Sequence, residues 1–241
     1  MQKKEFVRGV WQGVPICLGY LAVSFSFGIF AVGQGLSVLE TVFISMLNVT
    51  SAGQLAGVPI LAKGGGMLEL ALTQLVINLR YALMSVSLSQ RLDGTVRLRD
   101  RFLIAFVNTD EVFAVSAVQP RGVSRVYMYG LILTPYLGWT AGTALGAVAG
   151  NILPTVVSAA LGVAIYGMFI AIVVPGMRAH LPTALCVGVA VCLSLLFYYV
   201  PGLDRVPSGF VIIICAVLAS ALFAWLRPIE NGKRSEKEES V

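Results

Sequence analysis

The chain of 241 residues is 57% hydrophobic and only 12% charged, and its formal net charge at pH 7 is +5. One soluble core could not bury so many apolar side chains, so the composition excludes an ordinary soluble protein and is typical of a polytopic membrane protein. The basic residues fall in short loops between apolar stretches, where they indicate orientation in the lipid bilayer and no nucleic-acid partner.

Eight apolar stretches follow one another along the chain. Most approach the roughly 20 residues that an α-helix needs to cross a hydrocarbon layer of ~30 Å. The first continues directly into further membrane segments without a typical cleavage site, and we expect it to be retained as a span. The stretches cover residues 14–32, 38–62, 67–89, 102–118, 127–149, 156–177, 182–200 and 209–226. This pattern predicts an all-α polytopic integral membrane protein with about seven to eight membrane-embedded helices, forming one transport domain over residues 1–226.

The positions of the cations predict which loops face the cytoplasm, because short cytoplasmic loops carry an excess of Lys and Arg. The loops near 150–155 and 201–208 carry few charges and are expected outside. Both termini are then cytoplasmic, and the polar residues 227–241 are expected to form a solvated tail. The residues assigned to the cytoplasmic side are Lys3, Lys4, Arg8, Arg121, Arg125, Arg178, His180, Arg227, Lys233, Arg234 and Lys237.

The loop 91–101 conflicts with simple alternation, because alternation would place its four arginines outside. Two arrangements are open. In the first, 102–118 crosses the membrane, which gives eight spans and a basic outer loop. In the second, 102–118 dips in and returns, and an earlier segment, most plausibly 38–62, also fails to cross fully.

A faint internal repeat links the two halves of the chain. "RGVWQGVPICLG" begins at Arg8 and "SRVYMYGLILTPYLG" begins at Ser124, and each leads to a long apolar segment ending in Val-Pro, at 58–59 and at 174–175. Two internal repeats are a common transporter architecture. The alternative is a chance echo between glycine-rich segments.

Polar residues interrupt the stretch 38–62, where "NVTSAGQLAG" spans residues 48–57. One interpretation is close helix packing through small residues with interhelical hydrogen bonds. The other is a helix interrupted at membrane depth, whose freed amides and carbonyls line a polar cavity and bind a substrate. The candidate residues in this segment are Asn48, Ser51 and Gln54.

Ionisable residues lie inside two further stretches. Arg80 stands near the middle of 67–89, two residues after Asn78, and Asp110 and Glu111 lie together in 102–118. A cation at the centre of a span costs at least ~2.5–3.5 kcal/mol, which pairing or water must offset. Adjacent helical residues point about 100° apart, so we expect only one of the two acids to pair with Arg80. The pair is then either structural or part of a transport or proton-relay site.

The chain offers no enzymatic motif, such as HExxH, GxSxG or a phosphate-binding GxxxxGK[ST] sequence. Its four cysteines lie in apolar segments without a CxxC pair or a neighbouring histidine, which indicates packing and not a metal site. The sequence predicts neither an enzyme nor a cofactor. Without an ATP-binding loop, uphill transport must draw on a gradient.

Three short motifs occur in order: "SAGQ" at 51–54, "NLRY" at 78–81 and "TDEVFA" at 109–114. In this setting the chain resembles, over residues 6–226, the AzlC family, the large subunit of branched-chain amino acid exporters of the LIV-E type. The resemblance implies export of small apolar amino acids, usually with a small membrane subunit of the AzlD type. Family members often carry His where this chain has Tyr81, so no proton-transfer role is implied there.

A transported amino acid suits the polar residues singled out above. Arg80 can hold the substrate carboxylate through a bidentate fork, and Asp110 or Glu111 can hold the ammonium or a coupling proton. Asn48, Ser51, Gln54 and Asn78 can complete the hydrogen bonds. Two alternatives remain: a channel or facilitator for a small neutral solute, and a non-transporting membrane scaffold subunit.

Overall fold

The computed structural model describes residues 2–120, 122–154 and 173–226, together with 156, 167 and 170. The described chain divides into two compact units, Met1–Phe169 and Ile170–Val241, which we consider separately. The predicted stretch 156–177 falls largely outside the described residues. Arg121 and the predicted tail 227–241 fall outside them as well.

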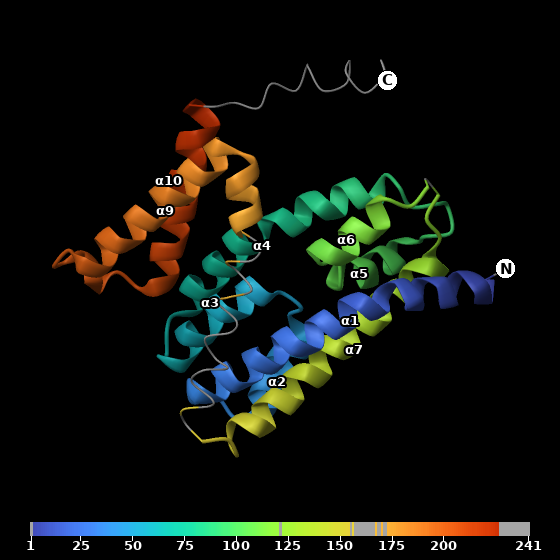
Figure 1. The fold of residues 1–241 in the computed structure, drawn as a ribbon, viewed down its shortest axis with the longest axis horizontal. Coiled ribbons are helices and arrows are strands. Elements are labelled where there is room, and N and C mark those ends of the chain that lie inside the picture. Colours follow the sequence, from blue (N-terminus) through green and yellow to red (C-terminus); the bar gives the residue numbers. More distant parts are fainter. Residues whose placement is uncertain are drawn as a thin grey trace. The chain divides into compact units, whose positions relative to one another are not determined.

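The described residues form α-helices joined by turns and one short 3-10 helix (Figure 1). The first unit contains α1 (Gln2–Gly33), α2 (Val38–Leu47), α3 (Ser51–Ala62), α4 (Met67–Ser89), α5 (Leu98–Phe106), α6 (Asp110–Ala117) and α7 (Arg125–Gly150). The second contains α9 (Leu181–Tyr199), η1 (Leu203–Arg205) and α10 (Ser208–Leu226), with α9 and α10 side by side. Among the helices of the described residues, five are long and apolar enough to cross a membrane: α1, α4, α7, α9 and α10. The predicted all-α polytopic membrane fold is confirmed.

Helices α1 and α7 lie side by side along their lengths and run in parallel (Figure 1). A Cβ atom added at Gly130 would overlap the backbone of Phe6, and one added at Gly146 would overlap the backbone of Phe25. Residue numbers thus increase together along both helices. Glycines at four-residue spacing on α7, with others facing them on α1, allow this backbone-to-backbone approach. Each helix also contains a proline, Pro15 in α1 and Pro135 in α7. The two similar sequences that begin at Arg8 and Ser124 thus both form the first half of a long, proline-containing helix.

Helices α5 and α6 form a hairpin that begins and ends at the same end of the first unit. The backbone N–H groups of Gly122 and Val123, just before α7, both donate to the carbonyl of Arg91, just after α4. Leu88 and Val96 share a buried cluster with Val123. With nine and eight residues, α5 and α6 are each about 12–14 Å long, too short to cross the bilayer. The segment 98–117 therefore enters the membrane and returns.

Side-chain hydrogen bonds connect both ends of this hairpin to α1 and α7. The Asp100 carboxylate, at the start of α5, accepts hydrogen bonds from the Tyr129 hydroxyl and from the backbone N–H of Arg97, and these bonds lower the pKa of Asp100. Gln119, just beyond α6, accepts a hydrogen bond from Arg8. The hairpin is thereby held beside the first turns of α1 and α7.

Helices α2 and α3 form a second hairpin, which enters from the opposite end. Ser37 caps α2 in a capping box with Glu40, directly after α1 ends. Val58 of α3 returns to pack on Phe27 and Ala31 in the last third of α1. With ten and twelve residues, α2 and α3 are about 15 and 18 Å long. This hairpin, too, reaches only about halfway across the bilayer.

The tips of the two hairpins both lie about halfway along α1 and α7, where two tyrosines each contact both hairpins. Tyr20 packs with Val49 at the α2–α3 tip and donates a hydrogen bond to Glu111 of α6. The hydroxyl of Tyr136 donates to the carbonyl of Met46 at 3.1 Å, while its ring lies 6.1 Å from that of Phe106 at the end of α5. In the described part of the first unit, three long helices thus surround two opposed half-length hairpins.

This arrangement removes the conflict over the loop 91–101. Of the two alternatives, the helix lengths favour the second, in which neither 38–62 nor 102–118 crosses. The loop 91–101 lies where α1 and α7 begin and α4 ends, which we term the basic end; the opposite end is the far end. The cations at the basic end are Lys3, Lys4, Arg8, Arg91, Arg97, Arg99, Arg101 and Arg125, whereas α3 and α4 are joined at the far end with Lys63 alone.

We expect Gly146→Ala to destabilise the protein by about 1–3 kcal/mol, because the added methyl group overlaps the rigid backbone of Phe25. Gly19→Ala is the matched control, since a Cβ there meets nothing within 4 Å and alanine favours the helix. The measurement is the thermal unfolding midpoint in detergent. Equal midpoints for the two variants would contradict the close α1–α7 contact.

The two hairpins also predict membrane sidedness. In a chain whose four native cysteines are replaced, Lys4→Cys and Arg99→Cys should react with a membrane-impermeant thiol reagent from one side, and Lys63→Cys from the other. The measurement is labelling of intact cells against inverted vesicles. Labelling of Lys4→Cys and Lys63→Cys from one side, with Arg99→Cys on the other, would instead indicate that both segments cross.

Candidate functional site

The sequence breaks the helices at the hairpin tips with Asn and Thr, whose side chains compete for backbone partners. Asn48 and Thr50 have extended backbone, with φ of −142° and −136°. The Thr50 hydroxyl donates to the Asn48 side-chain oxygen at 2.8 Å. At the other tip, Thr109 caps α6 by accepting a hydrogen bond from the N–H of Val112. The predicted interruption of 38–62 is therefore present, and 102–118 contains a second one.

Gln74 of α4 connects the α2–α3 tip to the middle of the long helix. Its side-chain nitrogen donates to the carbonyl of Gly53 in the first turn of α3 at 2.8 Å. Its oxygen accepts from the side-chain nitrogens of Asn78 at 3.0 Å and Asn48 at 3.4 Å. Sequence reasoning missed Gln74, although its position one helical turn before Asn78 was a usable signal.

Gln54 of α3 belongs to a second hydrogen-bonded group at this tip, which reaches α7. Its side-chain nitrogen donates to the hydroxyl of Ser45 at 3.0 Å, and Ser45 hydrogen-bonds the hydroxyl of Thr143 at 2.7 Å. Gln54, Ser45 and Thr143 are all buried. Ser51, the first residue of α3, is partly buried. We call Asn48, Gln54, Gln74, Asn78, Ser45 and Thr143 the tip network.

Arg80 forms an ion pair with one of the two candidate acids. Its guanidinium lies 2.7 Å from the Asp110 carboxylate, and both side chains are about half exposed. The same guanidinium donates to the hydroxyl of Tyr81 at 3.1 Å and lies 4.9 Å from the centre of its ring. Glu111 points elsewhere and accepts a hydrogen bond from Tyr20. Tyr20 was not predicted to belong to the site, because its neighbours in the sequence give no sign of a polar partner.

The structure thus sorts the predicted site residues into two groups along α4. Asn48, Gln54 and Asn78 belong to the tip network, whereas Arg80, Asp110 and Glu111 form the ionic group at the start of α6. Asn78 and Arg80 are two residues apart on α4, so one helix carries members of both groups. Farther along α4, Ser85 accepts a hydrogen bond from Asn108 at the tip of the α5–α6 hairpin.

A cavity of about 810 Å³ reaches the tip network from the far end. It is lined at the far end by Gln34 and Leu36 and at the tip by Asn48, Gln54 and Gln74, with apolar walls between them. Arg80, Asp110 and Glu111 are not among its lining residues. The cavity therefore connects one end of the first unit with polar groups at its centre.

Several buried polar atoms near the tips have no hydrogen-bond partner among the described residues. Three are amide oxygens, those of Gln54, Asn78 and Asn108. Leaving such an atom unpaired costs about 1–3 kcal/mol, so each calls for an explanation such as a bound ligand. Amide oxygens accept hydrogen bonds, and an ammonium group supplies three N–H donors.

Comparison with known proteins identifies the family of this chain. The model of the AzlC protein family matches residues 15–153, which is more than half of the chain. No solved structure is significantly similar to the chain.

Named relatives cover most of the chain. An uncharacterized membrane protein of Archaeoglobus fulgidus is 32% identical over 191 residues, which cover 78% of this chain and 84% of the relative. The inner membrane protein YgaZ of Escherichia coli is 31% identical over 192 residues, covering 77% and 78%. The branched-chain amino acid transport protein AzlC of Bacillus subtilis is 23% identical over 141 residues, covering 57% and 55%. With its apolar helices and these relatives, the chain is a multi-pass membrane protein with a role in transport, and it belongs to the AzlC family.

Proposed function

We propose that this protein is a gradient-coupled secondary transporter that exports branched-chain or similar small apolar amino acids across the cytoplasmic membrane. The observation that carries the proposal is that the tips of two half-length hairpins both contact Tyr20 at the centre of the first unit, with polar groups and unpaired amide oxygens at these tips. Interrupted helices that meet at the bilayer midplane commonly form transporter binding sites. The apolar walls of the far-end cavity suit an aliphatic side chain.

The charged ends of an amino acid would be held by different groups. The substrate carboxylate binds the guanidinium of Arg80, which offers a planar fork of donors. The ammonium binds the acceptor oxygens of Gln54 and Asn78, which lack partners among the described residues. Discrimination among aliphatic side chains rests on methylene-sized differences worth about 1–3 kcal/mol, so we expect a broad substrate range.

Asp110 gives a route for coupling to protons. Arg80 and Asp110 lie 2.7 Å apart, so a proton that binds Asp110 changes the charge beside the guanidinium that holds the substrate carboxylate. Proton binding and substrate binding are thereby linked at this ion pair. Glu111, hydrogen-bonded to Tyr20, is left to hold the α6 start against α1.

The orientation of the chain in the membrane follows from the asymmetry of charge. We assign the basic end to the cytoplasm, because cytoplasmic loops are enriched in Lys and Arg. The N-terminus is then cytoplasmic and the far-end cavity opens outward. We further propose a cytoplasmic C-terminal tail at 227–241 and a small partner subunit of the AzlD type, as the family resemblance implies.

The direct test is counterflow of labelled valine, leucine and methionine into proteoliposomes containing this chain, with and without an added AzlD-type subunit. Accumulation that depends on internal unlabelled substrate supports a carrier. Rapid equilibration without accumulation would indicate a channel, and no flux under either condition would indicate a scaffold subunit.

We expect Arg80→Lys to lose most of the transport, because an ammonium keeps the charge but cannot form the planar fork. The matched control is Arg99→Lys, which changes an exposed arginine at the basic end. Both variants are compared with the unmodified chain by initial rates of leucine counterflow. Near-normal rates for Arg80→Lys would remove Arg80 from the substrate site.

The two adjacent acids should respond differently to neutralisation. Asp110→Asn should abolish the dependence of export on a pH gradient, because Arg80 loses its titratable partner. Glu111→Gln should retain it, since a glutamine oxygen can still accept the hydrogen bond from Tyr20. Initial rates between about pH 6 and pH 8 measure both. If Asp110→Asn stays coupled, the coupling group lies elsewhere.

A further inference from the structure

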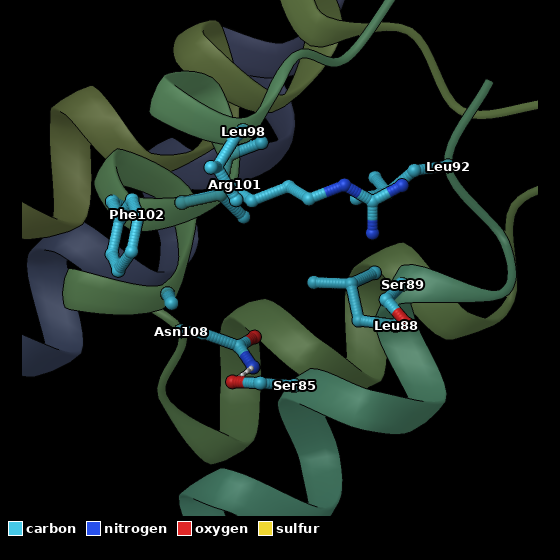
Figure 2. A pocket seen from close by; sticks show the side chains of 10 residues that line it. Ser85, Leu88, Ser89, Leu92, Leu98, Arg101, Phe102 and Asn108 are labelled. Atoms are coloured by element: carbon cyan, nitrogen blue, oxygen red, sulfur yellow. Dashed lines mark hydrogen bonds between the residues drawn. The ribbon is translucent and has the colours of Figure 1, made fainter. Parts of the chain in front are cut away.

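A second cavity lies at the basic end, between the last turns of α4 and the α5–α6 hairpin (Figure 2). Its volume is about 200 Å³, below the roughly 300–1,000 Å³ typical of pockets for drug-sized molecules. The walls are mainly apolar. The polar side chains that line the cavity are those of Ser85, Ser89, Arg101 and Asn108. The apolar side chains that line it include Leu88, Leu92, Leu98, Phe102 and Ile104.

Arg101 is the one cation among the lining residues. Its side chain extends across the cavity toward Leu92 (Figure 2). Within the described part of the chain, no side-chain hydrogen bond or ion pair engages its guanidinium, whereas Arg80 and Arg8 each have partners. A guanidinium beside apolar walls is best satisfied by a planar anion, and a carboxylate matches its paired donors.

Asn108 lines the same cavity at its inner side and is only 2% exposed. Its side-chain nitrogen donates to the hydroxyl of Ser85 at 3.3 Å, which fixes the amide and leaves the oxygen without a partner among the described residues. A buried acceptor in that state requires an N–H or O–H donor. Asn108 is also the residue at the tip of the α5–α6 hairpin, next to the cap of α6.

We propose that this cavity is a loading site that binds a small apolar carboxylate from the basic end. Arg101 binds the carboxylate, and Leu88, Leu92 and Phe102 surround the aliphatic body. The oxygen of Asn108 receives the ammonium as the solute moves inward to the hairpin tips. The choice of an amino acid as ligand rests on the proposed function, whereas the preference for a carboxylate rests on Arg101 alone.

The loading site is tested by protection of a single cysteine in the full-length chain. Ser89 lines the cavity, and Ser89→Cys is introduced after replacement of Cys17, Cys186, Cys192 and Cys215. The rate of reaction with a small thiol reagent is measured with L-leucine, with 4-methylpentanoate, which lacks the ammonium, and with leucinamide, which lacks the carboxylate. We expect leucine and 4-methylpentanoate to slow the reaction and leucinamide to leave it unchanged.

The matched pair of second substitutions is Arg101→Gln and Arg99→Gln. Arg99 is exposed and does not line the cavity, so protection should persist in Arg99→Gln. Arg101→Gln should raise the half-protecting concentration about tenfold or more, the effect of losing one charge-assisted hydrogen bond. Protection by leucinamide, equal behaviour of the two variants, or the absence of any protection would each overturn the site.

These outcomes are separable from failure of the proposed function. If proteoliposomes transport no amino acid while 4-methylpentanoate still protects Ser89→Cys through Arg101, the carboxylate site stands and the export proposal fails. If export is measured but Arg101→Gln leaves protection unchanged, the loading site fails and the export proposal stands.

Discussion

A helix that ends halfway across a bilayer leaves backbone N–H and C=O groups where no water can reach them, and such groups cost several kcal/mol each unless the protein supplies partners. The described part of the first unit contains two such breaks, and polar side chains form hydrogen bonds with backbone groups at both. Tyr136 donates to the carbonyl of Met46 in the last turn of α2, and Thr109 caps α6. Side chains that solve this structural problem also gather polar groups at the centre of the molecule.

The long helices contact these tips from two sides. The glycine-lined contact of α1 with α7 makes a rigid pair that presents Tyr20 and Tyr136 to both hairpins. Helix α4 runs past the other side and contacts the tips through Gln74, Arg80 and Ser85. One cavity reaches the α2–α3 tip from the far end, and a second one at the basic end is lined by Asn108 of the α5–α6 tip.

Much of this architecture could be predicted from the sequence, because apolar length and buried polar residues are local features. The interruption near Asn48 and the pairing of Arg80 with one acid followed from the cost of polar groups in hydrocarbon. The sequence left open whether 102–118 crosses or folds back, because the return depends on hydrogen bonds between Arg91 and Val123, far apart in the chain. Tyr20 and Tyr136 were missed for the same reason, as their polar partners come from other helices. The roles in substrate binding assigned to Asn48, Ser51, Gln54, Asn78, Arg80, Asp110 and Glu111 remain predictions.

The central claim is that the hairpin tips enclose a water-accessible substrate site, and substrate protection of labelling tests it most directly. Single cysteines at Ser51 and at Gln54, in a chain without its native cysteines, are treated with a small membrane-permeant thiol reagent. Leu137→Cys, at an exposed position halfway along α7, serves as the control. The account predicts labelling at both tip positions, slowed by saturating leucine, and little labelling at the control. Absence of labelling at both tip positions, or labelling that leucine does not slow, would contradict it.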